Sequence, residues 1–302
     1  MVMEYKDLSL SDKSLIVPLI EPTDRRNCDL SWSNLCSWRF LYATTYAILY
    51  GDTVLFRFRA GGERVYLMPV GRGDMKKALA VMRDECHEEG HPLVVYGVCE
   101  EHLPLFEEVM PGQTEHFADR AYADYLYLRT SLSTLSGKAL QPKRNHVNKF
   151  LKTYPDWEYL PILPEHIGEC LELERLWCIA NGCDQNAGLG QERRAVTYAL
   201  EHFSELGLSG GLLRVGGRIV AFTFGMPINH DTFGVHVEKA DSSIDGAYAM
   251  INREFARRIP ERFVYVNREE DLGLEGLRKA KLSYHPAILL NKYTVREKGG
   301  RS

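Results

Sequence analysis

The chain has 302 residues, of which 45% are hydrophobic and 26% are charged, the composition of an ordinary folded protein of about two domains. Its formal net charge of -4 at pH 7 gives no overall attraction to nucleic acid or anionic lipid, so binding of either would need a local basic patch. No run approaches the roughly 20 apolar residues that span a bilayer, and the mixed charges near the start are untypical of a signal peptide. We therefore expect a cytoplasmic protein without a membrane-spanning segment.

The seven cysteines are an odd number, lie far apart and show no C-x-x-C spacing. This pattern predicts reduced thiols rather than a disulfide framework. Residues 87–91 match the H-E-x-x-H zinc signature, but Gly90 and Pro92 break the helix that would bring both imidazoles to one face. We expect no metal ligands in this chain.

In the first half, two β-rich runs flank Gly61 and Gly62, which is the composition of a β-hairpin. A helix, a strand, a short helix and another strand follow, so the order is strand, strand, helix, strand, helix, strand. The corresponding ranges are 53–60, 64–71, 74–89, 92–98, 100–110 and 122–129.

The second half opens with helical runs at 164–180 and 191–206 and then shows the same core order again. A meander of three strands leads to a helix, a strand, a helix and a last strand, at 211–217, 218–225, 231–239, 247–259, 263–267, 274–282 and 287–295. This repetition predicts a duplicated α/β (α+β) fold, with the junction near 137–152 and domains at 1–145 and 146–302.

Two further short motifs lack the context that their chemistry needs. Residues 207–211 match the G-x-S-x-G motif of a nucleophile elbow, but they run from a helix to a strand, the reverse of what an elbow requires. Residues 185–190 match the Q-x-x-G-x-G loop of GCN5-related acetyltransferases, but a helix precedes them where a strand would have to deliver the loop. We interpret both as connections that begin at a helix end.

Charged residues gather after two strands that one helix connects, 231–239 and 263–267. The right-handed crossover rule makes these strands parallel neighbours with their C-terminal ends side by side, where ligands of open α/β sheets collect. Basic side chains there suit a phosphate or carboxylate, and a carboxylate there could hold an amine or take its proton. Alternatively, Asp271 caps the next helix, Glu269 and Glu270 lie at its positive end, and the basic residues form its solvated face. The sequence pattern leaves both interpretations open.

Four stretches resemble one bacterial protein family, and the most specific is the run N-R-E-E-D-x-G-x-x-x-L-R-K-A-K-x-S-Y-x-P. They are residues 31–38, 140–150, 237–256 and 266–286. This family is similar to the cytoplasmic C-terminal domain of phosphatidylglycerol lysyltransferases. The resemblance implies two tandem GNAT-like (GCN5-related acyltransferase) folds, each a mixed sheet flanked by helices. It also implies kinship with Fem-type peptidyltransferases, which move an aminoacyl group from charged tRNA to an amine or hydroxyl.

The chain departs from these families at two points. We expect no counterpart of the membrane-spanning flippase portion of the lysyltransferases, which disfavours a lipid acceptor. Residues 240–246 hold one glycine where acetyltransferases have a glycine-rich loop, which disfavours acetyl-coenzyme A as the donor. We therefore expect an aminoacyltransferase that uses aminoacyl-tRNA as its donor and a small molecule, lipid or peptide as its acceptor. An acyl-CoA-dependent N-acetyltransferase and a non-catalytic RNA- or peptide-binding module of the same fold are the alternatives.

The resemblance and the charge pattern together place the expected site in the second half. For proton removal, amine recognition and orientation we expect Glu269, Asp271, Asn267 and Tyr284. The residues expected to bind substrate are Glu238, Lys239, Asp241, Tyr248, Arg268, Arg278, Lys279, Lys281 and Ser283. The basic segment 138–152 either meets RNA phosphates or is a solvated connector, and its candidate nucleic-acid contacts are Lys143, Arg144, Asn145, His146 and Lys149.

Overall fold

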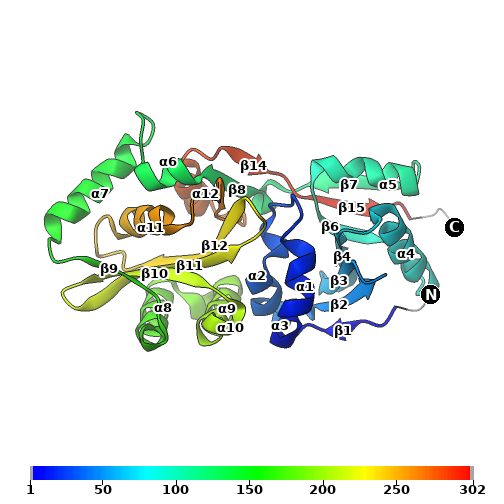
Figure 1. Cartoon of the computed structure of the whole chain (residues 1–302), viewed down its shortest axis with the longest axis horizontal. Helices are drawn as coiled ribbons and strands as arrows, with labels where there is room; N and C mark the ends of the chain where they lie inside the picture. The colour runs from blue at the N-terminus through cyan, green and yellow to red at the C-terminus, as the bar shows by residue number, and fades with distance from the viewer. Residues whose placement is uncertain (1–2, 300–302) are drawn as a thin grey trace.

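A computed structural model of the chain describes residues 3–299, apart from the side chain of Asp184. It contains two mixed β-sheets with helices against their faces, so the predicted α/β fold class is confirmed. Figure 1 shows an elongated molecule in which helices α1 (Lys13–Ile20), α2 (Trp32–Ser37) and α3 (Arg39–Tyr42) lie between the two sheets. The arrangement agrees with the two tandem GNAT-like folds that the resemblance implied.

The first sheet follows the order β1-β2-β3-β4-β6-β15-β7, with β5 paired to β3. The hairpin predicted around Gly61 and Gly62 is the antiparallel pair β3 and β4, and both glycines have the positive φ that the tight turn requires. Helices α4 (Met75–Glu88) and α5 (Leu103–Val109) cover one face of this sheet. Its strands are β1 (Lys6–Asp7), β2 (Thr45–Leu49), β3 (Thr53–Ala60), β4 (Glu63–Leu67), β5 (Val70–Gly71), β6 (Val94–Val98), β7 (Thr114–Ala118) and β15 (Tyr293–Glu297).

The second sheet follows the order β14-β8-β13-β12-β11-β10-β9. One face packs against α6 (Arg129–Thr134), α7 (Gln141–Thr153) and α11 (Ala247–Arg258). The other packs against α8 (Ile167–Asn181) and α9 (Ala187–Glu201), which the short helix α10 (Phe203–Leu206) follows. The strands are β8 (Asp124–Leu128), β9 (Glu158–Pro161), β10 (Ser209–Val215), β11 (Arg218–Pro227), β12 (Thr232–Ala240), β13 (Tyr265–Asn267) and β14 (Ile288–Leu290), and α12 (Glu275–Leu282) lies between β13 and β14.

The two sheets exchange strands across the predicted division at residues 145 and 146. Strand β8 comes from the first half of the chain but lies inside the second sheet, between β14 and β13. The single last strand predicted at 287–295 is wrong, because the chain forms β14 in the second sheet and then β15 in the first sheet, between β6 and β7. Domains at 1–145 and 146–302 remain a prediction about folding units, and the hydrogen-bonded sheets do not follow that boundary.

One hydrophobic core joins the two halves. It contains Trp32 of α2, Phe56 of the first sheet, and Phe222 and Phe224 of the second sheet, all of them buried. The first-half helices α1 and α2 therefore pack against both sheets. This places the polar residues just before α2 directly over the second sheet.

The prediction that all seven cysteines are reduced is wrong for two of them. Cys178 and Cys183 form a disulfide, with their Cα atoms 5.1 Å apart. Gly182 ends α8 in the left-handed conformation, which folds the chain back so that Cys183 meets the last turn of the helix. The other five cysteines are buried thiols. None of the helices within residues 3–299 is long and apolar enough to cross a bilayer.

The three short motifs lie in the contexts expected from the sequence. His87 is in the last turn of α4 and contacts Glu297, whereas His91 lies beyond the helix and contacts Glu89, so the two imidazoles do not share a site. Gly207 ends helix α10 immediately before β10. Residues 185–190 include the N-cap Asn186 and the first turn of α9, and the Asn186 side chain accepts N–H groups of that turn that a phosphate would otherwise meet.

Candidate functional site

The candidate site lies where the parallel strands β12 and β13 diverge. The predicted pairing is present, and it ends with Gly234 opposite Asn267. Because β12 continues to Ala240, the two C-terminal strand ends do not lie side by side as expected. The chain turns away after β13 at Glu269, which has a φ of 59° and whose N–H donates to Asn267 Oδ1 (2.7 Å). Polar side chains from both halves surround this point.

Asn267 and Asp124 form the buried centre of the site, and neither is exposed to solvent. Asn267 Nδ2 donates to Asp124 Oδ2 (2.7 Å) and to the carbonyl oxygen of Arg26 (2.7 Å). Asp124 Oδ2 also accepts the backbone N–H of Cys28 (2.7 Å). In this geometry Asn267 holds the segment before α2 against the second sheet, which is a role in orientation.

Three side chains form a continuous hydrogen-bonded set that we name the Ser–His–Glu chain: Ser31, His236 and Glu269. His236 Nδ1 lies 2.7 Å from Glu269 Oε1, and His236 Nε2 lies 2.9 Å from Ser31 Oγ. Since an ionised carboxylate can only accept, His236 donates from Nδ1, and the neutral imidazole accepts from Ser31 at Nε2. Asn34 Nδ2 also donates to Glu269 Oε1 (2.7 Å) and fixes the carboxylate from α2.

The buried ammonium of Lys292 lies among three carboxylates and a thiol. Its Nζ is 2.9 Å from Asp124 Oδ1, 3.0 Å from Asp29 Oδ2 and 3.5 Å from Cys28 Sγ, and it also pairs with Glu270. Burial favours a lower pKa for Lys292, but the surrounding charges, with Asp124 first, raise the pKa well above its usual range. Lys292 lies between β14 of the second sheet and β15 of the first sheet, so this cluster stabilises the position where the chain crosses from one sheet to the other.

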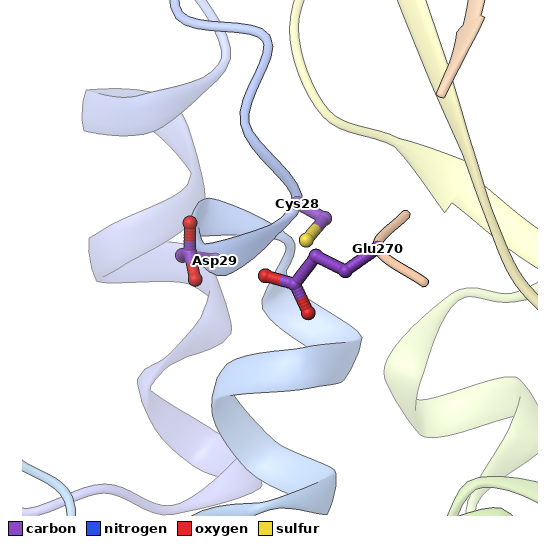
Figure 2. Close-up of side chains that lie close together, drawn as sticks. All are labelled: Cys28, Asp29 and Glu270. Carbon is purple, nitrogen blue, oxygen red and sulfur yellow. The ribbon is translucent and has the colours of Figure 1, made fainter. Parts of the chain in front are cut away.

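Figure 2 shows the side chains of Cys28, Asp29 and Glu270 close together. One sulfur or carboxylate oxygen from each residue lies within 4.8 Å of the others. A thiol and two carboxylates are a possible ligand set for a metal ion. However, the Lys292 ammonium already contacts all three residues, and burial keeps the pKa of the Cys28 thiol well above its usual range. A neutral thiol beside a bound ammonium is not a metal ligand, so the geometry does not support a metal site.

Two other ionisable groups beside this cluster have shifted pKa values. Burial raises the pKa of Glu270 to about 8. Burial, followed by the charge of Arg268, lowers the pKa of Lys281 to about 8. The Lys281 ammonium donates to the backbone carbonyls of Arg268 (2.5 Å) and Glu270, so it fixes the path of the chain after β13.

Arg268 lies in the gap between β12 and the chain beyond β13. Its Nη2 donates to Glu238 Oε1 (2.9 Å), and its guanidinium stacks on Tyr284 (4.8 Å to the ring centre). Burial favours a lower pKa for Arg268, and the charge of Glu238 outweighs this and raises it. Glu238 also accepts Asn252 Nδ2 (3.0 Å). Arg268 Nη1 and Asn252 Oδ1 are both buried without a hydrogen-bond partner among the residues that the structure describes.

Asp271 is wholly buried and serves the structure. Its carboxylate accepts from Arg278 Nε (2.8 Å) and Nη2 (2.9 Å), from Arg120 Nη1 (3.1 Å), from the Tyr125 hydroxyl (2.6 Å) and from the Gly273 N–H (2.9 Å). The hydrogen bond from Arg278 is the main reason that its pKa lies far below the usual range. Proton removal by Asp271 therefore has no support in this geometry, and Arg278 is held away from substrate by the same contact.

Most of the other predicted substrate contacts are spread over separate parts of the surface. Buried Lys239 pairs with Glu192 (2.7 Å) and lies on the Trp177 ring, whose Nε1 donates to Tyr248 (2.9 Å). Asp241 accepts from Ser243 in a turn and from Arg218 (3.0 Å). Lys279 is exposed on α12, and Ser283 donates to the carbonyl at the end of that helix. The structure does not bring these residues together.

The basic segment forms helix α7, and intramolecular contacts engage much of its charge. Lys143 lies on the Tyr284 ring (4.1 Å), and Arg144 donates to the carbonyls of Leu135 and Gly137, the latter at 2.7 Å. Lys149 and His146 lie beside Asp245, while Asn145 is bonded within the helix. Asn145, His146 and Lys149 remain exposed. RNA contact by this helix remains a prediction.

The site residues that sequence reasoning missed come from outside the charged run 266–286. They are Cys28, Asp29, Ser31, Asn34, Asp124, His236 and Lys292. A charged or polar residue inside an apolar strand was the available signal for Asp124 and His236. Ser31 and Asn34 lie in the stretch 31–38 that carries the family resemblance, but nothing in the sequence shows that the tertiary fold brings them, or Lys292, to β13.

Comparison with known proteins agrees with this architecture. A crystal structure of a conserved protein of unknown function from Bacteroides thetaiotaomicron VPI-5482 is 57% identical and superimposes with a TM-score of 0.95, covering 98% of this chain and 100% of that chain. L-PGS from Bacillus licheniformis is 14% identical and has the same fold, with a TM-score of 0.68 and coverage of 98% and 93%.

An uncharacterized protein of Mycoplasmoides gallisepticum is 27% identical over 175 residues, which are 57% of this chain and 56% of that protein, so the match spans about half the length of this curated relative. Residues 20–296 match the family described as phosphatidylglycerol lysyltransferase, C-terminal. That range includes nearly all of both sheets and every residue of the candidate site. The chain therefore belongs to the phosphatidylglycerol lysyltransferase C-terminal family.

Proposed function

We propose that the chain is an aminoacyltransferase that moves an aminoacyl group from aminoacyl-tRNA to a hydroxyl or amine acceptor. Its family is one of transferases, and the family description names a lysyl group and phosphatidylglycerol. The observation that carries the proposal is the Ser–His–Glu chain, because it presents an oriented imidazole at the divergence of two parallel strands. Lysyl-tRNA as donor and phosphatidylglycerol as acceptor are the first pair to test.

Because the aminoacyl ester of the donor is already activated, the enzyme mainly has to transfer a proton in the proposed reaction. The acceptor oxygen or nitrogen attacks the ester carbonyl of the aminoacyl-tRNA, and a new ester or amide bond forms. The bond between that carbonyl and the terminal ribose oxygen of the tRNA breaks. The acceptor loses one proton and the ribose oxygen gains one, so no oxidant or further co-reactant is required. A base that can accept and return a proton near neutral pH is sufficient.

His236 is the group best arranged for that proton transfer. Its Nδ1 is bound to Glu269, which fixes the tautomer and stabilises the imidazolium that forms when Nε2 takes a proton. Its side chain is only 3% exposed, so solvent does not compete for the ring. We assign Glu269 and Asn34 to orientation and His236 to proton transfer through its bond to Ser31.

The same order of groups occurs in enzymes with a nucleophilic serine, but the surroundings of Ser31 favour a different role. Ser31 is 1% exposed, and its neighbours Cys28 and Trp32 are buried too. An acyl donor cannot reach the Ser31 hydroxyl in this conformation. Direct transfer, in which Ser31 relays a proton to His236, requires only the acceptor to hydrogen-bond to Ser31. It therefore needs a smaller opening of the segment before α2 than a covalent acyl-serine intermediate does, and we favour it for that reason.

The pair of unsatisfied atoms beside Glu238 supports a polar substrate group at this point. Within residues 3–299, the donor Arg268 Nη1 and the acceptor Asn252 Oδ1 have no hydrogen-bond partner, and both side chains neighbour the Glu238 carboxylate. Buried polar atoms are nearly always satisfied. A group that accepts one hydrogen bond and donates another, such as the carbonyl and amine of an aminoacyl ester, satisfies both.

The test is a transfer assay with radiolabelled lysyl-tRNA and two acceptors, phosphatidylglycerol vesicles and a soluble polyamine. We expect label to move to one acceptor. We also expect His236→Ala to lower turnover about a hundredfold to ten-thousandfold, the usual contribution of a general base. His230→Ala is the matched control, because this imidazole is 58% exposed and lies outside the site.

Folding of each variant is checked by circular dichroism before rates are compared. If the folded His236→Ala protein transfers label at the wild-type rate, the Ser–His–Glu chain is not the site of proton transfer. If no aminoacyl group moves while acetyl-coenzyme A is consumed, the donor assignment is wrong. Salt-sensitive tRNA binding without transfer to either acceptor would favour a binding module.

A further inference from the structure

A hollow of about 500 Å³ lies at the far end of α2 from the Ser–His–Glu chain. The first half contributes the end of α2 and the start of α3, and the second half contributes α9. Its lining residues are Cys36, Ser37, Arg39, Phe40, Gly190, Arg193, Arg194, Thr197, Tyr198 and Glu201. This volume is in the range of small-molecule binding sites. None of the residues of the candidate site lines it.

Three arginines give this hollow a positive charge in a chain that is negative overall. Arg39 lies on the Tyr198 ring (4.4 Å to its centre), and Arg194 lies on the Phe40 ring (3.9 Å). Stacking fixes the plane of each guanidinium and leaves N–H groups at its edge for a ligand. Within the described part of the chain, neither these two nor Arg193 forms an ion pair with a carboxylate, and Arg39 donates only to the Cys36 carbonyl (2.7 Å). The hollow therefore suits an anion.

A second observation points to the same place. The hydroxyl of Ser37, a residue that is 4% exposed, is buried and has no hydrogen-bond partner among the residues that the structure describes. An unsatisfied buried hydroxyl is costly, and native proteins normally satisfy such a group with protein, water or ligand. Ser37 lines the hollow with the three arginines, so a ligand there satisfies it.

We propose that this hollow binds the phosphate group of a small phosphate ester. Guanidinium groups pair with two phosphate oxygens at once, and several of them around one pocket favour a phosphate over a single carboxylate. The volume exceeds what a bare phosphate fills, so an organic part remains attached and lies against Phe40 and Tyr198. Arg193, Arg194 and Ser37 bind the phosphate oxygens.

The position of the hollow connects it with the candidate site. Ser31 precedes α2 and Ser37 ends it, so a rise of 1.5 Å per residue places them about 9 Å apart. Binding at this hollow does not rest on the proposed function, and it is measured without any aminoacyl donor.

The test is calorimetric titration of the whole chain with glycerol 3-phosphate, with inorganic phosphate and with glycerol. We expect glycerol 3-phosphate to bind, glycerol not to bind, and added salt to weaken binding. Arg193→Gln and Arg194→Gln should each weaken binding about ten- to a hundredfold, as loss of a charge-assisted contact does. Ser37→Ala should weaken it about two- to tenfold without lowering stability, because the hydroxyl has no hydrogen-bond partner to lose among the residues that the structure describes.

Arg175→Gln is the matched control, since this exposed arginine on α8 pairs with Glu172 outside the hollow and its loss should leave binding unchanged. Thermal unfolding shows whether each variant is folded. Equal affinity of wild type, Arg193→Gln and Arg194→Gln would overturn the proposal, as would binding of neutral glycerol. If inorganic phosphate binds as tightly as glycerol 3-phosphate, the proposal of a phosphate-ester site is wrong and the hollow is a simple anion site. These outcomes leave the transfer assay unaffected.

Discussion

Replacement of Asp271 by asparagine tests whether this residue serves stability or chemistry. The wild-type carboxylate is 0% exposed and accepts five hydrogen bonds, of which three come from arginines. Asparagine keeps one acceptor oxygen but places an amide N–H₂ against the Arg278 fork. Breaking a buried ion pair costs about 3–5 kcal/mol. Because Arg120 and Arg278 are 37% and 36% exposed, water solvates their charges, and we expect a loss nearer about 2–3 kcal/mol.

The pH dependence gives an independent check of the same variant. The pKa of Asp271 in the folded state lies far below its ordinary value of 3.8, so the unfolded state binds the proton first as pH falls. The stabilisation by this group is fully present above pH 3.8 and is lost below it, toward the folded-state pKa. Asp271→Asn removes that part of the acid sensitivity, so the two proteins should converge in stability as the pH is lowered.

Urea unfolding at pH 7 and at lower pH values measures both effects. Asp245→Asn is the control, because that carboxylate is 46% exposed and its pair with Lys149 is screened by solvent, so the replacement should change stability little. A variant at position 271 with wild-type stability and lost transfer activity would refute the structural reasoning. It would return Asp271 to the list of groups that contact substrate.

Three further predictions concern stability. Lys292→Met leaves the wholly buried Asp124 and the half-buried Asp29 and Glu270 without their cation. We expect a loss of about 3–5 kcal/mol in urea unfolding, or failure to accumulate as folded protein. A wild-type-like result would show that the cluster is not an ion-pair centre. Burial raises the pKa of Glu174, in α8, from 4.5 to about 7. The wild type should therefore lose stability as pH rises from 4.5 to 7, and Glu174→Gln should abolish this loss. If the two proteins show parallel profiles of stability against pH, the assignment is contradicted. Replacing Cys178 and Cys183 by serine removes the cross-link that closes a short loop, and we expect thermal unfolding to show a loss of about 2 kcal/mol in stability. As the control, the wild type and this variant should melt at the same temperature in reductant.

The crossover β12, α11 and β13 shows what the sequence could predict. Apolar strands joined by an amphipathic helix fix a parallel pair through a chirality rule, and the structure has that pair. The mismatch in strand length could not be predicted, because the turn at Glu269 depends on a hydrogen bond from its own N–H to Asn267 Oδ1 and on contacts of its carboxylate with α2. The run of charged residues therefore predicted correctly that the site lies between β12 and β13, but it placed the site at the C-terminal end of β12 instead of beside Gly234.

The roles of the individual charged residues could not be predicted from the sequence pattern. Asp271 serves the structure, but the predicted helix cap is wrong: the N-cap of α12 is Leu274, and the Asp271 carboxylate instead binds Arg278 and the N–H of Gly273. The contacts of His236 with Ser31 and of Lys292 with Asp124 join residues that lie far apart in sequence. Such contacts depend on which strands pair in which sheet, and the spacing of apolar residues does not predict that β8 joins the second sheet and β15 the first.

The exchange of β8 and β15 means that a single cut in the chain cannot yield two complete halves. A fragment ending near residue 145 would retain β8 without its partners β13 and β14, and its own sheet would have a gap between β6 and β7 where β15 belongs. The remaining fragment would carry an unpaired β13 edge, and exposed edges of this kind invite pairing with other chains. Each fragment alone should therefore associate or aggregate, and mixing the two should restore a folded complex through mutual strand donation.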